Sequence, residues 1–171
     1  TTPSNFKLIM FPLSQSFDEG VGRDIIQFSD LDATNWVTSS VTNGSATGWN
    51  TPGARASGTL GDENIDVIVS GSIPIYGSDG LSYVTLSPEM AFNDGDEDLS
   101  LDITRIVSST LVGSIPDNGF VIAYSGSFET NQNTYFVKRF ASRNTTNTRI
   151  KPKIIVKYND TVQDHHENFF F

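Results

Sequence analysis

The sequence contains no cysteine, so neither a disulfide framework nor a thiolate metal site is possible. It has no apolar run close to the roughly 20 residues that a membrane-spanning helix needs, and the run at residues 6–13 is short and contains Pro12. The only histidines are the adjacent pair His165 and His166, and no Gly-x-Ser-x-Gly motif occurs. Because no apolar run is long enough to span a bilayer, we expect no membrane contact. Because a Ser-His-Asp site needs a histidine beside its serine, we also expect no nucleophilic enzyme.

Basic residues are scarce and unevenly placed. The chain has 11 Lys and Arg against 20 Asp and Glu, a net charge of −9, which argues against nucleic acid as a partner. Residues 138–157 hold seven of the basic residues and no acidic one, so they carry +7 and the rest of the chain −16. Three interpretations stay open: lysines that protect a solvated strand edge from stray pairing, a phosphate-binding patch, and contact between copies in which the basic segment meets an acidic surface.

Short strands dominate the predicted secondary structure. Apolar residues alternate with polar ones in residues 135–142 and 153–158, which predicts a closing β-hairpin around a polar turn. Further strands are predicted at residues 6–11, 65–70, 81–86, 99–103 and 119–125. Helical patterns are brief, at residues 22–28, 30–36 and 103–109, with Asp102 as a cap for the last.

These patterns predict an all-β fold, an antiparallel β-sandwich of the jelly-roll type with one or two short helices. At 171 residues the chain fits one domain. We place a single β-sandwich domain at residues 1–160. The aromatic end, Phe169 to Phe171, leads us to expect that residues 161–171 begin a linker or a following strand of a longer polypeptide.

Residues 38–63 are weakly apolar and rich in Gly, Ser, Thr and Asn, which predicts a long surface loop held by Trp49. Trp49 and Tyr76 are the candidates for stacking on a glycan, whereas Trp36 lies beside Leu31 and Val37 and is expected in the core. Loop anchoring is the equal alternative for Trp49.

An acidic turn is the candidate for a structural calcium site, and calcium is the one cofactor that the sequence suggests. Residues 93–98 place several oxygen-bearing side chains around Gly95, and Asp94, Asp96 and Asp98 are the candidate ligands. The spacing does not match an EF-hand, and a solvated turn is the commoner structure. The same carboxylates offer an acid and a base for glycoside cleavage, but nothing fixes their separation, so we expect no enzyme.

Several longer stretches resemble a domain in structural proteins of tailed bacteriophages. They are residues 16–24, 28–32, 35–36, 97–107, 115–120, 136–143, 151–153 and 159–164. More distantly, the order of elements is similar to the DNRLRE-type jelly-roll domains of bacterial surface proteins and to carbohydrate-binding modules. There an aspartate-led segment and a short helix, here residues 101–107, precede a Gly-Phe strand, a Ser-Arg hairpin and a last strand that contains proline.

The resemblance implies a β-sandwich, a virion location and a role in assembly without catalytic residues. The expected partners are other virion proteins or copies of the chain itself. The alternative is a carbohydrate-binding module, extracellular or on a cell surface, that contacts glycans. From the residues themselves we expect Arg139 and Arg143 to bind Asp18 and Glu19 through paired hydrogen bonds, as a clamp for the N-terminal segment.

Overall fold

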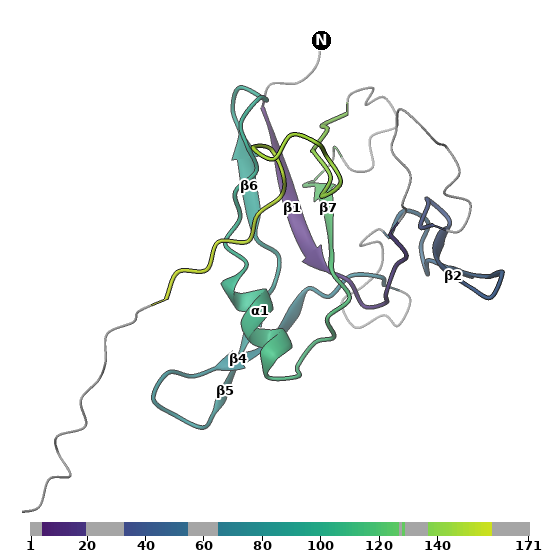
Figure 1. Cartoon of the computed structure of the whole chain (residues 1–171). Coiled ribbons are helices and arrows are strands. Elements are labelled where there is room, and N and C mark those ends of the chain that lie inside the picture. The colour runs from purple at the N-terminus through teal and green to yellow at the C-terminus, as the bar shows by residue number, and fades with distance from the viewer. Residues whose placement is uncertain (1–4, 20–32, 55–64, 127, 129–136, 159–171) are drawn as a thin grey trace, which may run out of the picture. The chain divides into compact units, whose positions relative to one another are not determined.

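The computed structural model describes residues 5–19, 33–54, 65–126, 128 and 137–158. The chain divides into two units, residues 1–136 and residues 137–171. All the helices and strands of the described residues belong to the first unit (Figure 1). The predicted helix at residues 22–28 lies outside the described part of the chain, and residues 33–36, at the end of another predicted helix, are not helical.

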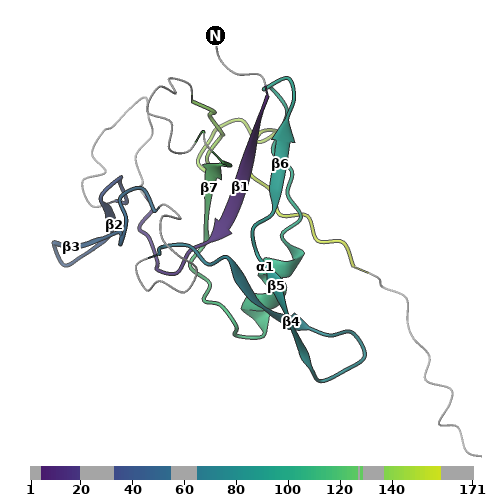
Figure 2. The ribbon, with the colours of Figure 1, turned by 180° about the vertical axis from the view of Figure 1, so that it is seen from behind.

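A three-stranded antiparallel sheet has β1 (Phe6–Pro12) at its centre, between β6 (Glu89–Phe92) and β7 (Phe120–Tyr124) (Figure 2). Phe6 pairs with Phe92, and Leu8 pairs with Met90 on one side and Tyr124 on the other. The rings of Phe6 and Phe92 stack with their centroids 4.8 Å apart. Because β1 alternates apolar side chains at this face, Phe6, Leu8 and Phe92 form a buried cluster.

A second core joins a hairpin to the helix. The hairpin consists of β4 (Ser70–Pro74) and β5 (Leu81–Thr85), and the helix is α1 (Thr104–Leu111). Leu86, Ile106 and Ile115 are buried together between them. Ser109 of α1 is also buried, and its hydroxyl donates to the Ser72 carbonyl at 2.7 Å. The apolar side of α1 thus packs on β4, and a buried hydroxyl fixes the contact.

A third pair of strands, β2 (Thr38–Thr42) and β3 (Ser45–Gly48), forms a tight hairpin. Its two turn residues are Asn43, with φ 51°, and Gly44, with φ 77°. Two consecutive positive φ angles match the strand twist in a two-residue turn, and Asn-Gly is the favoured pair for them. The prediction of a long surface loop at residues 38–63 is therefore wrong for residues 38–48, which form two strands of mostly polar side chains.

The second unit has no helix or strand among residues 137–158. The predicted closing hairpin is therefore wrong for residues 137–142 and 153–158, although both carry the alternating pattern. A strand needs a neighbouring edge as well as a pattern, and no described residue supplies that edge. Residues 135 and 136 lie outside the described part.

Of the remaining predicted helices and strands, some are confirmed and others are wrong. Strands β1, β5 and β7 and helix α1 confirm four predicted elements, and the structure agrees with an all-β class containing one short helix and small antiparallel sheets. The strand predicted at residues 65–70 begins only at Ser70, and residues 99–103 form no strand. Among the described residues, no helix is long and apolar enough to cross a membrane. The single-domain boundary at residue 160 stays a prediction.

Candidate functional site

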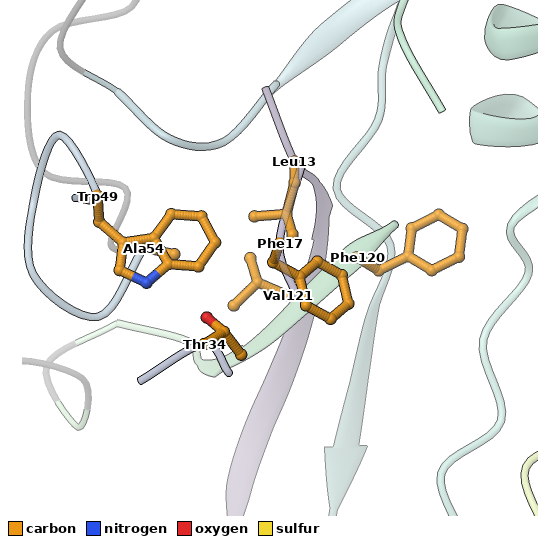
Figure 3. A pocket seen from close by; sticks show the side chains of 7 residues that line it. All are labelled: Leu13, Phe17, Thr34, Trp49, Ala54, Phe120 and Val121. Atoms are coloured by element: carbon orange, nitrogen blue, oxygen red, sulfur yellow. The ribbon is translucent and has the colours of Figure 1, made fainter. Parts of the chain in front are cut away.

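A hollow lined by described residues has a volume of about 180 Å³ and lies where β1 ends and β7 begins, beside the segment after β3. Figure 3 shows the indole of Trp49 on one side and the ring of Phe17 on the other. The hollow is lined by Leu13, Phe17, Thr34, Trp49, Ala54, Phe120 and Val121. Six of these seven side chains are apolar, so the hollow suits an apolar group or the flat face of a ring.

Trp49 is held in place by its polar atoms. Its indole N–H donates to the Asn35 carbonyl at 3.0 Å, and its backbone N–H donates to the Val37 carbonyl at 3.0 Å. The indole is half-buried. These two hydrogen bonds are consistent with the expected anchoring role of Trp49. The N–H edge of the indole is already hydrogen-bonded within the chain.

Asp66 is the buried polar centre of this region. The side chain is fully buried. One carboxylate oxygen accepts from Gln15 Nε2 at 2.6 Å and from both the backbone and the amide of Asn50 at 3.0 Å. The other accepts from the Thr51 N–H at 2.8 Å. A buried carboxylate with four hydrogen bonds ties the segment after Trp49 to the segment after β1.

The chain turns sharply at Gly53, two residues after Thr51, which binds Asp66. The φ of Gly53 is +84°, and a Cβ at this position would lie 2.4 Å from the Trp36 ring. Ala54, which lines the hollow, also has a positive φ of 52°. The predicted core position of Trp36 is wrong: the residue is 61% exposed and covers the Gly53 backbone from outside.

The residues that line the hollow are apolar except for one. Its one polar side chain, Thr34, donates its hydroxyl to the Thr38 carbonyl at 3.1 Å. No titratable side chain is among the residues that line it. The arrangement can hold an apolar side chain or a sugar face, and its lining residues supply no group that moves a proton.

The acidic turn after β6 is organised around Glu97. The Glu97 carboxylate accepts N–H bonds from Asn93 at 2.6 Å, Asp94 at 3.0 Å and Gly95 at 2.8 Å. The N–H groups of Asp94, first, and of Asn93 lower the pKa of the Glu97 carboxyl from 4.5 to about 2. Glu97 thereby fills the turn with its own carboxylate.

Calcium binding at this turn stays a prediction. No group of three or more His, Asp or Glu side chains within the described ranges is placed to hold a metal ion. Asp94, Asp96 and Asp98 therefore receive no further support from the geometry as ligands. The backbone donors of the turn point to Glu97.

The predicted clamp pairs Asp18 and Glu19, which belong to the first unit, with Arg139 and Arg143, which belong to the second. Asp18 accepts from the Val41 N–H at 2.6 Å, and its backbone N–H donates to the Ser39 carbonyl at 3.0 Å. This residue therefore fixes the N-terminal segment to β2. Arg139 and Arg143 belong to the second unit, and their pairing with Asp18 and Glu19 stays a prediction.

Tyr76 is in the turn between β4 and β5 and is 98% exposed. Trp49 follows β3, so the two candidate glycan contacts come from different hairpins. Leu81 and Tyr83 on β5 are exposed as well. Tyr76 therefore belongs to the β4–β5 hairpin, while Trp49 belongs to the hollow.

Sequence reasoning missed Asp66. It is the single carboxylate in the otherwise apolar run at residues 65–69, and such a position signals a paired buried charge. Its donors at Gln15 and Asn50 are ordinary loop residues, so their role could not be read from the sequence. No family model, curated protein or solved structure matches the chain.

Proposed function

We propose that this chain is a structural domain of a tailed-phage virion, assembled in several copies, that acts by protein–protein contact without catalysis. The small antiparallel sheets and the short helix are compatible with a jelly-roll sandwich. The virion location is supported by the sequence resemblance of residues 16–24 and 136–143 to virion proteins.

The observation that carries the proposal is the exposure of aliphatic side chains in the second unit. Ile154, Ile155 and Val156 are consecutive, and they are 74%, 78% and 74% exposed. Val137 and Tyr158 are exposed as well. A group of exposed apolar side chains marks a surface that another molecule covers, and the seven basic residues of this segment favour an acidic partner.

Quantitative mass spectrometry of purified particles of the encoding phage tests the proposal. We expect the chain in a fixed copy number of more than one per particle, as assembly predicts. Its absence from washed particles, with abundant free protein in the lysate, would contradict a structural role.

A carbohydrate-binding module is the second candidate, and the exposed ring of Tyr76 favours it. Binding on a glycan array that disappears in Tyr76→Ala would support this function. Tyr158→Ala, which removes another exposed tyrosine from the second unit, is the matched control. Trp49→Ala is less suitable because it also removes the bond to Asn35.

A further inference from the structure

The segment Lys153–Tyr158 has the composition of a strand and has no partner strand among the described residues. In its sequence, KIIVKY, Ile154, Val156 and Tyr158 alternate with Lys153, Ile155 and Lys157, and β-branched and aromatic residues fill four of its six positions. No backbone hydrogen bond of these six residues occurs within the described chain. Three consecutive aliphatic side chains stay about three-quarters exposed, which is costly in water.

The outer edge of β5 is the complementary feature in the first unit. In this hairpin the Ile75 N–H donates to the Gly80 carbonyl, and the Leu86 N–H donates to the Val69 carbonyl. Since hydrogen-bonded pairs alternate in an antiparallel ladder, the register makes Ile73–Ser82 and Gly71–Val84 the bonded pairs between them.

The backbone groups of the intervening residues therefore point away from the hairpin. On the β4 side the groups of Ser72 at the middle of the strand are satisfied, because its N–H donates to the Ser114 hydroxyl oxygen and its carbonyl accepts from the Ser109 hydroxyl. On the β5 side the outward groups belong to Leu81, Tyr83 and Thr85, for which the described residues provide no partner. Within the described part of the chain, β5 is thus an open edge.

The two features match in length, chemistry and charge. β5 has five residues and the segment six. Ile154, Val156 and Tyr158 share one face, as do Leu81 and Tyr83 on β5, which are 55% and 76% exposed. Added as a neighbouring strand, the segment would place apolar and aromatic side chains side by side across the pair.

Charge selects a second copy as the source of the strand. Residues 1–136 have four Lys and Arg against 17 Asp and Glu, a net charge of −13. Residues 137–171 have seven against three, a net charge of +4. Each copy therefore carries both a basic donor segment and an acidic acceptor unit, so that the donor of one copy is complementary in charge to the acceptor of another.

We propose that Lys153–Tyr158 of one copy adds as a strand to the β5 edge of a second copy. This inference rests on the proposed function of protein–protein contact and names the partner. Addition would pair the open groups of Leu81, Tyr83 and Thr85 and place Ile154 and Val156 beside the apolar face of β5.

The absence of native cysteine permits a direct test. Tyr83→Cys protein is mixed with Val156→Cys protein of different tag length, and a short thiol cross-linker is added. We expect a mixed dimer on a denaturing gel, several-fold above the yield with Thr47→Cys, an exposed site on β3. Equal yields for both acceptors would overturn the proposal, and so would a linked monomer from the Tyr83→Cys/Val156→Cys double variant at high dilution.

Thr85→Pro provides a second test within the same experiment. It removes one outward N–H from the edge and leaves the hairpin bonds to β4 intact, so we expect the mixed dimer to fall several-fold while the circular-dichroism spectrum is unchanged. An unchanged dimer yield in a folded Thr85→Pro protein would contradict strand addition. If the cross-link fails while particles contain the chain in several copies, only the strand addition is wrong and the virion role stands.

Discussion

At the scale of single residues, Asp66 shows how one buried carboxylate organises a region of weak sequence pattern. Its four hydrogen bonds reach Gln15, Asn50 and Thr51. These contacts hold the segment that carries Trp49 and Ala54 against the end of β1. The hollow beside β7 therefore depends on a residue that does not line it.

The replacement Asp66→Asn should lower the free energy of unfolding by about 1–3 kcal/mol, because the new amide group faces backbone donors and leaves at least one of them unpaired. Urea unfolding measures the change. Asp79→Asn, in the exposed turn after β4, is the matched control and should be neutral within about 0.5 kcal/mol. Equal stabilities of the two variants would contradict the role of Asp66.

Glu97 predicts a pH dependence of the acidic turn. Its pKa is about 2 in the folded chain and 4.5 ordinarily. A depressed pKa means that the stabilising bonds are fully present above pH 4.5 and are lost as the pH falls toward 2. The amide signals of Asn93, Asp94 and Gly95 should therefore move with a midpoint near pH 2 in an NMR titration.

The Glu97→Gln variant is the control for this titration, since it removes the titrating group, and its three amides should show no such midpoint. A midpoint near the ordinary value of 4.5 in the native chain would mean that the Glu97 carboxylate does not hold these N–H groups.

At the scale of elements, close backbone packing decides the contact between β4 and α1. A Cβ on Gly71 would lie 2.8 Å from Leu86 Cδ1 and 2.9 Å from Ser109 Oγ. Leu86 and Ser109 are both fully buried, so neither has free space to move. This strand position therefore requires a residue without a side chain.

Gly71→Ala should destabilise the chain by about 1–3 kcal/mol through overpacking, as measured by thermal or urea unfolding. Gly48→Ala on β3 is the matched strand control, because its Cβ would meet only the Val37 carbonyl at an ordinary 3.5 Å. A Gly71→Ala protein as stable as the control would contradict the close packing of β4 on α1.

Elements with strong alternation were predictable from the sequence, and those defined by pairing were not. The apolar run of β1 and the Asp102-led start of α1 are visible in the residues. The carboxylate of Asp102 accepts the Thr104 hydroxyl at 2.6 Å and its N–H at 2.9 Å, and these two bonds, the hydroxyl first, lower the pKa of Asp102. By contrast, β2 and β3 carry mostly polar side chains, and β6 has only four residues.

The candidate site was predictable only in part. Trp49 has a clear signal, a single large side chain in a polar stretch, and the structure places it at the hollow. Phe17, Phe120 and Val121 come from distant segments, and only tertiary contact brings them to Trp49. Trp36 was misjudged because apolar sequence neighbours do not show which side of a turn a ring covers.

At the scale of the whole molecule, the sorting of charge and the exposure of Lys153–Tyr158 support one account. An acidic unit with an open β5 edge and a basic unit with an unpaired apolar segment are joined in one chain. Such a chain is suited to contact with further copies of itself. The attraction should weaken as salt concentration rises, since exposed charges are screened beyond about 10 Å at 0.1 M salt.

Hydrogen exchange as a function of protein concentration tests this account most directly. We predict that alternate amides of residues 153–158 and those of Leu81, Tyr83 and Thr85 become protected together as the concentration rises, and that dilution removes the protection from both groups. Exchange of all the amides of residues 153–158 at unprotected rates at every concentration, or equal protection at extreme dilution, would contradict contact between copies.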